Sequence, residues 1–289
     1  MDAMSRIERT LEAAIARASG PQAPPLLAQA LSYAVFPGGT RLRPRLCLAV
    51  AAACGDHDPA LADAAASSIE LLHCASLVHD DLPCFDDAAT RRGKPSVHKA
   101  FGEPIAVLVG DALIVLAFEA LAHSATKSPE RLAPVTLIVA QSVGMPSGIA
   151  AGQAWECEPS PPLGDYQRAK TGALFAAATA AGAAAAGHDI AGWRLLGERL
   201  GEAYQVADDI RDVESSPEEL GKPVGQDQLF GRPSAVTQYG VQGAKHLLEE
   251  LVDGAIDAIP ACPGAYLFRK LVVAEANRFL PKDIARRAA

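Results

Sequence analysis

The chain carries two clusters of aspartates inside otherwise apolar sequence, at residues 80–87 (DDLPCFDD) and 208–212 (DDIRD). An unpaired carboxylate in an apolar setting is costly. Two unit charges about 4 Å apart repel by about 4 kcal/mol at an effective dielectric constant of about 20. A fold that gathers several carboxylates must therefore supply cations. Because oxygen ligands favour hard ions, and Mg²⁺ prefers a few carboxylates together with substrate phosphates, the clusters predict a site for magnesium and a diphosphate.

The second cluster has the spacing of a helix. Asp208 and Asp212 are four residues apart, so they share a helix face, and Asp209 lies beside them. Gln205 precedes them by one turn and reaches the same surface. The alternative is a solvated acidic helix end, which the surrounding apolar residues weaken, because these carboxylates belong to an otherwise apolar helix.

The first cluster breaks that four-residue rhythm. Pro83 disfavours helical geometry at the residue before it, so we expect a bulged turn that brings Asp86 back under Asp80. The alternative is an Asp-rich loop that follows a helix. The Arg91-Arg92 pair downstream weighs against this alternative, because guanidinium groups bind phosphate oxygens well.

Further polar candidates lie outside the clusters. His73 lies seven residues before Asp80, two helical turns back on the same face and about 10.5 Å along the axis. A lone His on an apolar helix is commonly a core residue, so a core role and a site role both remain open for His73. His79 lacks this support and is interpreted as structural. Weaker candidates, each of which also fits a surface loop, are Gly38, Gly39, Arg41, Arg43, Lys170, Thr171 and Lys222.

Composition favours an all-α chain. Of the 289 residues 49% are hydrophobic and only 5% are aromatic. Small side chains with good helix propensity suggest closely packed helices, and no convincing alternating strand pattern is present. One all-α domain is the simplest prediction. Helices are expected over 5–18, 26–36, 45–54, 60–81, 104–122, 132–143, 148–157, 166–186, 190–213, 235–239, 244–259 and 266–278.

Several classes of protein are disfavoured. The net charge of −8 argues against a nucleic-acid binder, since such proteins usually carry a basic surface. Six cysteines without CxxC spacing predict free thiols in a reducing compartment rather than a zinc site. The N-terminus shows no targeting signal. The apolar runs 104–122 and 172–187 are interpreted as buried helices rather than as membrane spans.

Taken together, these residues resemble the trans-isoprenyl diphosphate synthases, or polyprenyl synthetases. The chain is most similar to bacterial geranylgeranyl diphosphate synthases of carotenoid and chlorophyll-type pathways. The resemblance is strongest over residues 26–240 and rests on the two Asp motifs with Arg91-Arg92-Gly93 between them. It implies a single polyprenyl synthetase domain over 1–289, folded as an all-α, single-domain helical bundle of the isoprenoid synthase type with a central cavity.

The resemblance also implies an activity. The protein would be a cytoplasmic, homodimeric prenyltransferase that uses Mg²⁺, with Mn²⁺ as a substitute, without nucleic-acid partners and without a transmembrane segment. It would condense isopentenyl diphosphate with an allylic diphosphate (dimethylallyl, geranyl or farnesyl) in the trans configuration. The allylic C–O bond ionises, isopentenyl diphosphate attacks the cation, and the released diphosphate removes a proton.

The family motifs assign roles to particular residues. Metal ligands would be Asp80, Asp81, Asp86, Asp208, Asp209 and Asp212. Catalytic residues would be Asp80, Asp81, Lys170, Thr171, Gln205 and Asp208. Substrate-binding residues would be Arg43, His73, Arg91, Arg92, Lys170, Thr171, Gln205, Lys222 and Arg232, with Gln153 near the allylic chain.

Three positions depart from the family pattern: Thr40 replaces a Lys, Glu156 replaces an Asp and Arg232 replaces a Lys. Thr40 removes one cation from the isopentenyl diphosphate site, and Arg41, Arg43 and Arg92 are the candidates for replacing it.

Product length would depend on what lies below the first cluster. Ala75 is five residues before Asp80, about 7.5 Å down the helix axis. Farnesyl-making relatives commonly place an aromatic residue there, so Ala75 predicts a twenty-carbon product, with Phe85, Leu113 and Phe118 as candidates for a floor. The rival functions are a farnesyl diphosphate synthase, a terpene cyclase, and a non-catalytic partner subunit of a heteromeric synthase.

Overall fold

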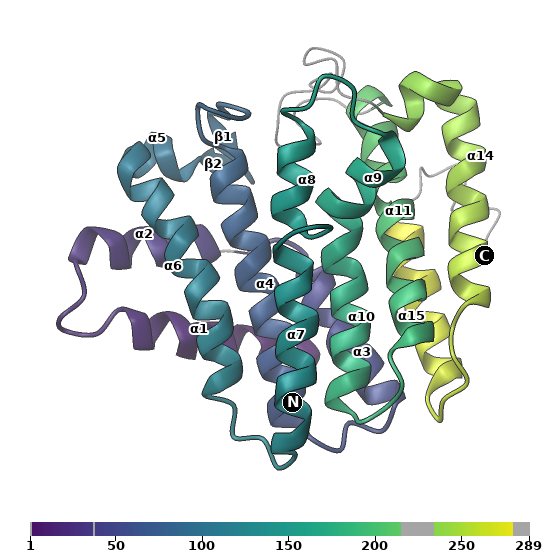
Figure 1. The fold of residues 1–289 in the computed structure, drawn as a ribbon, viewed down its shortest axis with the longest axis horizontal. Helices are drawn as coiled ribbons and strands as arrows, with labels where there is room; N and C mark the ends of the chain where they lie inside the picture. Colours follow the sequence, from purple (N-terminus) through teal and green to yellow (C-terminus); the bar gives the residue numbers. More distant parts are fainter. Residues whose placement is uncertain (1, 37, 215–233, 280–289) are drawn as a thin grey trace.

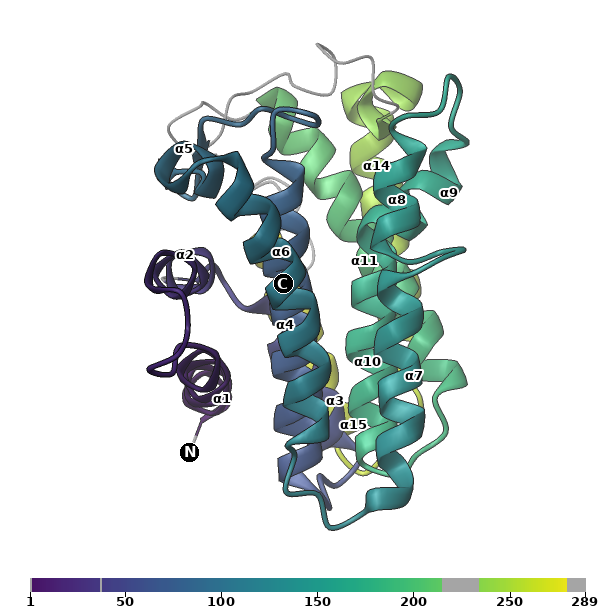
Figure 2. The same ribbon diagram turned by 60° about the vertical axis from the view of Figure 1, so that its left-hand side comes forward.

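The computed structural model describes residues 2–36, 38–214 and 234–279. Its long helices run side by side in a bundle, and α1 and α2 lie across one side of it (Figures 1 and 2). The helices are α1 (Ala3–Ala18), α2 (Pro25–Val35), α3 (Leu42–Ala53), α4 (Pro59–Asp80), α5 (Val97–Phe101), α6 (Glu103–Ala122), α7 (Leu132–Val143), α8 (Ile149–Trp155), α9 (Leu163–Gln167), α10 (Ala173–Ala185), α11 (Ala191–Glu214), α14 (Ala235–Asp257) and α15 (Ala265–Phe279). A short 3₁₀ turn, Pro129–Arg131, precedes α7, and a π-helical turn, Arg168–Gly172, joins α9 to α10.

The all-α prediction is confirmed, and most expected helices lie within a few residues of the observed ones. The expected helix over 166–186 is interrupted by the π turn, and the two expected over 235–239 and 244–259 form α14, which bends at Gly240 (φ 69°). The sequence also missed a hairpin of two antiparallel strands, β1 (Thr90–Arg91) and β2 (Lys94–Pro95). Strands of two residues are too short to show alternation.

α4 is the central helix of the bundle. It packs against α6, α3 and α10, and most of its side chains are small or aliphatic and fully buried, Ala65, Ile69 and Leu72 among them. Asp58 caps its first turn by accepting a hydrogen bond from the Leu61 N–H. The carboxyl end of α4 therefore has a fixed position, and this end carries the first Asp cluster.

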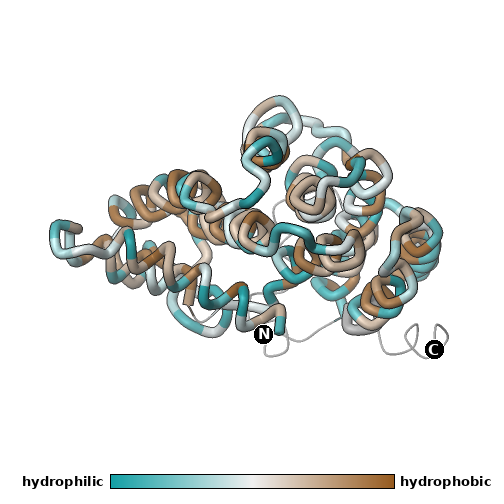
Figure 3. Tube along the Cα trace, turned by 90° about the horizontal axis from the view of Figure 1, so that it is seen from below, coloured by the Kyte–Doolittle hydropathy of each residue, from teal (hydrophilic) through white to brown (hydrophobic). Residues whose placement is uncertain are grey.

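Two described helices, α4 and α6, are long and apolar enough to cross a membrane. In α4, 78% of the apolar window is buried inside the bundle, as in a core helix, whereas in α6 only 44% is buried. Figure 3 shows hydrophobic residues recurring along the helices and a hydrophilic connection between α1 and α2. α6 exposes Val107, Leu108 and Val115 beside the exposed Asp111, and its neighbour α7 exposes Leu137.

Candidate active site

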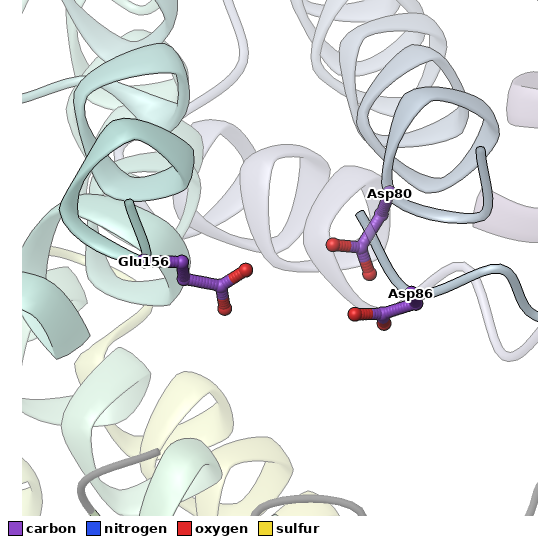
Figure 4. A group of neighbouring side chains, drawn as sticks. All are labelled: Asp80, Asp86 and Glu156. Atoms are coloured by element: carbon purple, nitrogen blue, oxygen red, sulfur yellow. The ribbon is translucent and has the colours of Figure 1, made fainter. Parts of the chain in front are cut away.

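The first Asp cluster forms the bulged turn that the sequence predicts. After α4 ends, the Asp86 N–H donates to the Asp80 carbonyl oxygen at 3.0 Å, and the Asp87 N–H donates to the Leu82 carbonyl at 3.1 Å. The turn brings Asp86 back beside Asp80. Glu156, which follows α8, faces both from across the site, and ligand oxygens of the three carboxylates lie within 4.8 Å of one another (Figure 4).

This group of Asp80, Asp86 and Glu156 fits a divalent ion. Oxygens bound to one octahedral Mg²⁺ at about 2.1 Å lie about 3.0–4.2 Å apart, so the group needs only a small contraction to hold one ion. A cation already contacts it, since the Lys170 Nζ lies 3.2 Å from Asp80 Oδ1 and makes a shorter ion pair with Glu156. The donor set, all carboxylate oxygen, suits a hard ion.

Asp81 has different surroundings from Asp80. Its side chain is buried, and both of its oxygens accept from the Arg91 Nε at 2.9 and 3.2 Å, with a shorter bond from Nη2. Burial raises the pKa of Asp81, and Arg91 opposes that rise. Asp81 therefore orients Arg91, and its predicted role as a metal ligand stays a prediction.

In the second cluster, as in the first, one aspartate is buried among its partners and its neighbour is partly exposed. Asp209 is buried and accepts hydrogen bonds from Gln205 Nε2 (2.8 Å), Gln167 Nε2 (3.4 Å) and the Ala235 N–H (2.7 Å). It thereby ties α11 to the start of α14. Asp208 is a third exposed, with Arg211 Nη2 at 3.9 Å. Metal binding by Asp208, Asp209 and Asp212 remains a prediction.

The π turn between α9 and α10 connects the two clusters. It presents Lys170 to Asp80, and the neighbouring Thr171 Oγ1 donates to Gln205 Oε1 at 2.6 Å. The backbone of α8 packs directly on this turn, because a Cβ at Gly152 would lie 2.3 Å from the Lys170 nitrogen. π turns are uncommon and often occur at functional sites. Lys170, Thr171 and Gln205, which the sequence groups by family motif alone, are thus brought together.

Arg43 and His73 also meet. The Arg43 guanidinium lies over the rings of Phe175 and Tyr204, 4.6 and 5.6 Å from their centroids, and its Nη1 is 3.4 Å from His73 Nε2. Burial, followed by the charge of Arg43, holds the pKa of His73 well below its ordinary value. A neutral His73 can accept a hydrogen bond from Arg43 and leave the positive charge on that residue. Of the two roles left open for His73, the contact with Arg43 favours the site.

The β1–β2 turn separates two adjacent arginines. Arg92 and Gly93 both have positive φ, 54° and 76°, as a two-residue type I′ turn requires. Arg91 consequently contacts Asp81, whereas the exposed Arg92 lies against Gly39, where an added Cβ would be 3.2 Å from its guanidinium.

Arg41 does not replace the cation missing at Thr40, contrary to the sequence-based expectation. Its guanidinium is fully buried and bonds Glu8 (2.8 Å), Glu70 (2.7 Å) and the Val35 carbonyl (2.9 Å). Arg41 ties α1 and α4 to the chain around α2. The described residues leave Arg43 and Arg92 as the candidates for binding a diphosphate there.

Four further predicted residues have mixed outcomes. Ala75 is buried on α4, with 1% of its surface exposed. Phe85 is 36% exposed and lies in the turn between Asp80 and Asp86, so a floor role for it stays a prediction. Lys222 and Arg232 fall outside the described residues.

Two contributors went unrecognised at the level of sequence. Glu156 stood out only as a departure from the family pattern, and Tyr166 not at all. Tyr166 donates its hydroxyl hydrogen to Glu156 at 2.7 Å, and Gln153 Nε2 donates to the same carboxylate at 3.1 Å. The spacing of Gln153 and Glu156, one helical turn, was the available signal.

Comparison with known proteins matches this architecture. The family described as polyprenyl synthetase matches residues 24–261. The chain is 55% identical to the geranylgeranyl diphosphate synthase of Cereibacter sphaeroides over 282 residues, covering 98% of each chain. It is 49% identical to that of Rhodobacter capsulatus, over 95% of this chain and 96% of the relative. A geranyltransferase of Helicobacter pylori, complexed with magnesium and isoprenyl diphosphate, has a TM-score of 0.84 at 30% identity and 96% coverage of both chains. The chain belongs to the polyprenyl synthetase family.

Proposed function

We propose that the protein is a prenyltransferase that condenses isopentenyl diphosphate with allylic diphosphates in the trans configuration and makes geranylgeranyl diphosphate. The observation that carries this proposal is the group of Asp80, Asp86 and Glu156 facing the Lys170 ammonium. Carboxylates that face a cation across a site can hold divalent ions and, through them, a diphosphate. The relatives named above, both called geranylgeranyl diphosphate synthases, support the twenty-carbon product. We propose in addition a role in carotenoid-type isoprenoid synthesis.

On the allylic side, Mg²⁺, or Mn²⁺ in its place, would supply positive charge to the departing diphosphate. Asp80 and Asp86 would hold ions from one side of the site, and Asp208 and Asp212 from the other. Arg91, oriented by Asp81, and Lys170 stabilise negative charge on the diphosphate oxygens. Thr171 and Gln205, which are hydrogen-bonded to each other, would present oxygens to the allylic cation.

On the other side of the site, Arg43 and Arg92 would bind the diphosphate of isopentenyl diphosphate. The neutral ring of His73 orients Arg43, and the rings of Phe175 and Tyr204 fix the plane of its guanidinium. With Thr40 in place of a lysine, this half of the site has one charge fewer, so we propose weaker binding of isopentenyl diphosphate than in relatives that keep the lysine.

Two alternatives remain distinguishable. A farnesyl diphosphate synthase would stop at fifteen carbons, and the farnesyl diphosphate synthase of Geobacillus stearothermophilus is 37% identical over 86% of both chains. The small side chain of Ala75 favours the longer product. A non-catalytic subunit would be expected to have lost one Asp cluster, and both clusters are present.

We further propose a homodimer and a cytoplasmic location. The exposed apolar side chains of α6 and α7, Val107, Leu108, Val115 and Leu137, are what two copies of the chain would bury against each other. All six cysteines are free thiols, which supports a reducing compartment. Light scattering of the protein as it elutes from a size-exclusion column should give twice the mass of one chain. Val115→Glu should reduce the measured mass to that of one chain.

One assay tests the activity. Purified protein is incubated with Mg²⁺, isopentenyl diphosphate and an allylic diphosphate of five, ten or fifteen carbons, and the products are identified by mass. We expect a twenty-carbon diphosphate from every accepted starter, and no turnover with EDTA. A product that stops at fifteen carbons favours the farnesyl alternative, and no elongation from any starter favours the partner subunit.

A further inference from the structure

Glu156 is the least expected member of the site. It follows the last residue of α8, and its carboxylate points across the gap toward Asp80 and Asp86, which come from the end of α4 and the turn after it (Figure 4). Three donors hold it: Tyr166, Gln153 and Lys170. A carboxylate fixed in this way is positioned before any ligand arrives.

Lys170 bridges the gap. Its Nζ contacts Asp80 and Glu156, two of the three carboxylates whose oxygens lie within 4.8 Å of one another. The Lys170 backbone is held by the π turn and by the close approach of Gly152, but its side chain is long and can turn about its own bonds. The Lys170 ammonium can therefore move, while the Lys170 backbone stays in place.

A divalent ion and this ammonium compete for the same oxygens. An ion bound to Asp80 and Glu156 would lie within a few ångströms of the ammonium, where two like charges repel strongly. Lys170 must then leave the carboxylates, and the proposed function gives it a new partner in the diphosphate oxygens.

We propose that the Lys170 ammonium occupies the Asp80–Asp86–Glu156 group until a divalent ion displaces it, that Glu156 is a ligand of that ion, and that the displaced ammonium turns to the diphosphate. This inference rests on the proposed function for the identity of the anion alone. The ammonium offsets part of the negative charge of the carboxylates before the ion arrives, and the exchange delays release of the lysine charge until the ion is in place.

The proposed exchange predicts opposite changes in ion affinity for two substitutions. Removing the carboxylate charge of Glu156 should weaken ion binding, whereas removing the charge of Lys170 should strengthen it, because the resident competitor is gone. A lysine that merely supports the fold would not strengthen ion binding when it is lost.

The test is a titration of the full-length protein with Mn²⁺ alone, without substrate, read by the electron paramagnetic resonance signal of free Mn²⁺. We expect Glu156→Gln to raise the dissociation constant about tenfold or more, and Lys170→Gln to lower it about fivefold or more. Glu158→Gln, a charge change at an exposed carboxylate two residues from Glu156, is the matched control and should leave the constant unchanged. Circular dichroism and the thermal midpoint establish that each variant is folded.

Unchanged Mn²⁺ affinity in Glu156→Gln would overturn the ligand role of Glu156. Unchanged or weaker affinity in folded Lys170→Gln would overturn the exchange, and Lys170→Met provides a second variant without the charge. Because no substrate is present, these outcomes are separate from the product assay. Failure of the wild-type protein to elongate any starter would remove the proposed function and leave the ion exchange intact.

Discussion

Asp80 and Asp81 are neighbours in sequence, yet the structure predicts opposite consequences for their loss. Asp80 faces Lys170, Asp86 and Glu156, while the buried Asp81 holds Arg91. We expect Asp80→Asn to lower turnover strongly while the fold keeps its stability, and Asp81→Asn to lower chiefly the stability of the fold.

The size of the Asp81→Asn effect follows from its partner. Removing one member of a buried ion pair costs about 3–5 kcal/mol when the remaining charge stays buried. The Arg91 side chain is 26% exposed and its Nη2 lies 3.6 Å from Asp80, so water and Asp80 compensate in part. We therefore expect a loss of about 2–3 kcal/mol in the free energy of unfolding. At about 2–4 °C per kcal/mol, the thermal midpoint should fall by about 4–12 °C.

Asp80→Asn should instead affect turnover more than the stability of the fold. The substitution removes one of three mutually repelling carboxylates, so the midpoint should change by less than about 2 °C. Turnover should fall about 100-fold or more, because charge on the departing diphosphate loses its stabilisation.

Thermal denaturation by circular dichroism and product formation at saturating Mg²⁺ measure the two quantities on the same preparations. If Asp81→Asn keeps its midpoint and loses activity as completely as Asp80→Asn, Asp81 acts at the metal, and the division of roles between the two aspartates is wrong.

Three other predictions follow from single contacts. Ala75→Tyr should shorten the product toward fifteen carbons, and an unchanged product by mass spectrometry would contradict the steric explanation. Gly152→Ala forces a methyl group to within 2.3 Å of the Lys170 nitrogen, so the thermal midpoint and turnover should both fall, and wild-type values for both would contradict the close packing. The pKa of His73 is depressed by burial, so the unfolded chain binds its proton more readily. The stability that His73 contributes is present above its ordinary pKa of about 6.5 and is lost as the pH falls below that value. Urea titrations between pH 5 and pH 8 should show this loss, with a flatter profile in His73→Gln, and equal slopes would exclude it.

The sequence predicted the long helices because their apolar periodicity is local, whereas it missed the five-residue helix α5 and the start of α9. It also predicted the turn that brings Asp86 back under Asp80, since Pro83 acts on its immediate neighbours. The hairpin that directs Arg91 and Arg92 to different partners was not visible, because strands of two residues have no pattern. The π turn at Lys170 was hidden inside an uninterrupted helical signal.

What the sequence alone determined is which residues could carry the chemistry: one acidic cluster at the end of a helix, a second within a helix, and the arginines and lysines that could oppose them. Only the tertiary structure decided which of two adjacent aspartates faces the site and that Glu156 lies beside Asp80. It also decided that Arg41 binds Glu8 and Glu70. The reason is physical. Spacing sets the direction of a side chain on its own helix, but burial and charge partners depend on segments distant in the chain, and these contacts determine the role of each carboxylate.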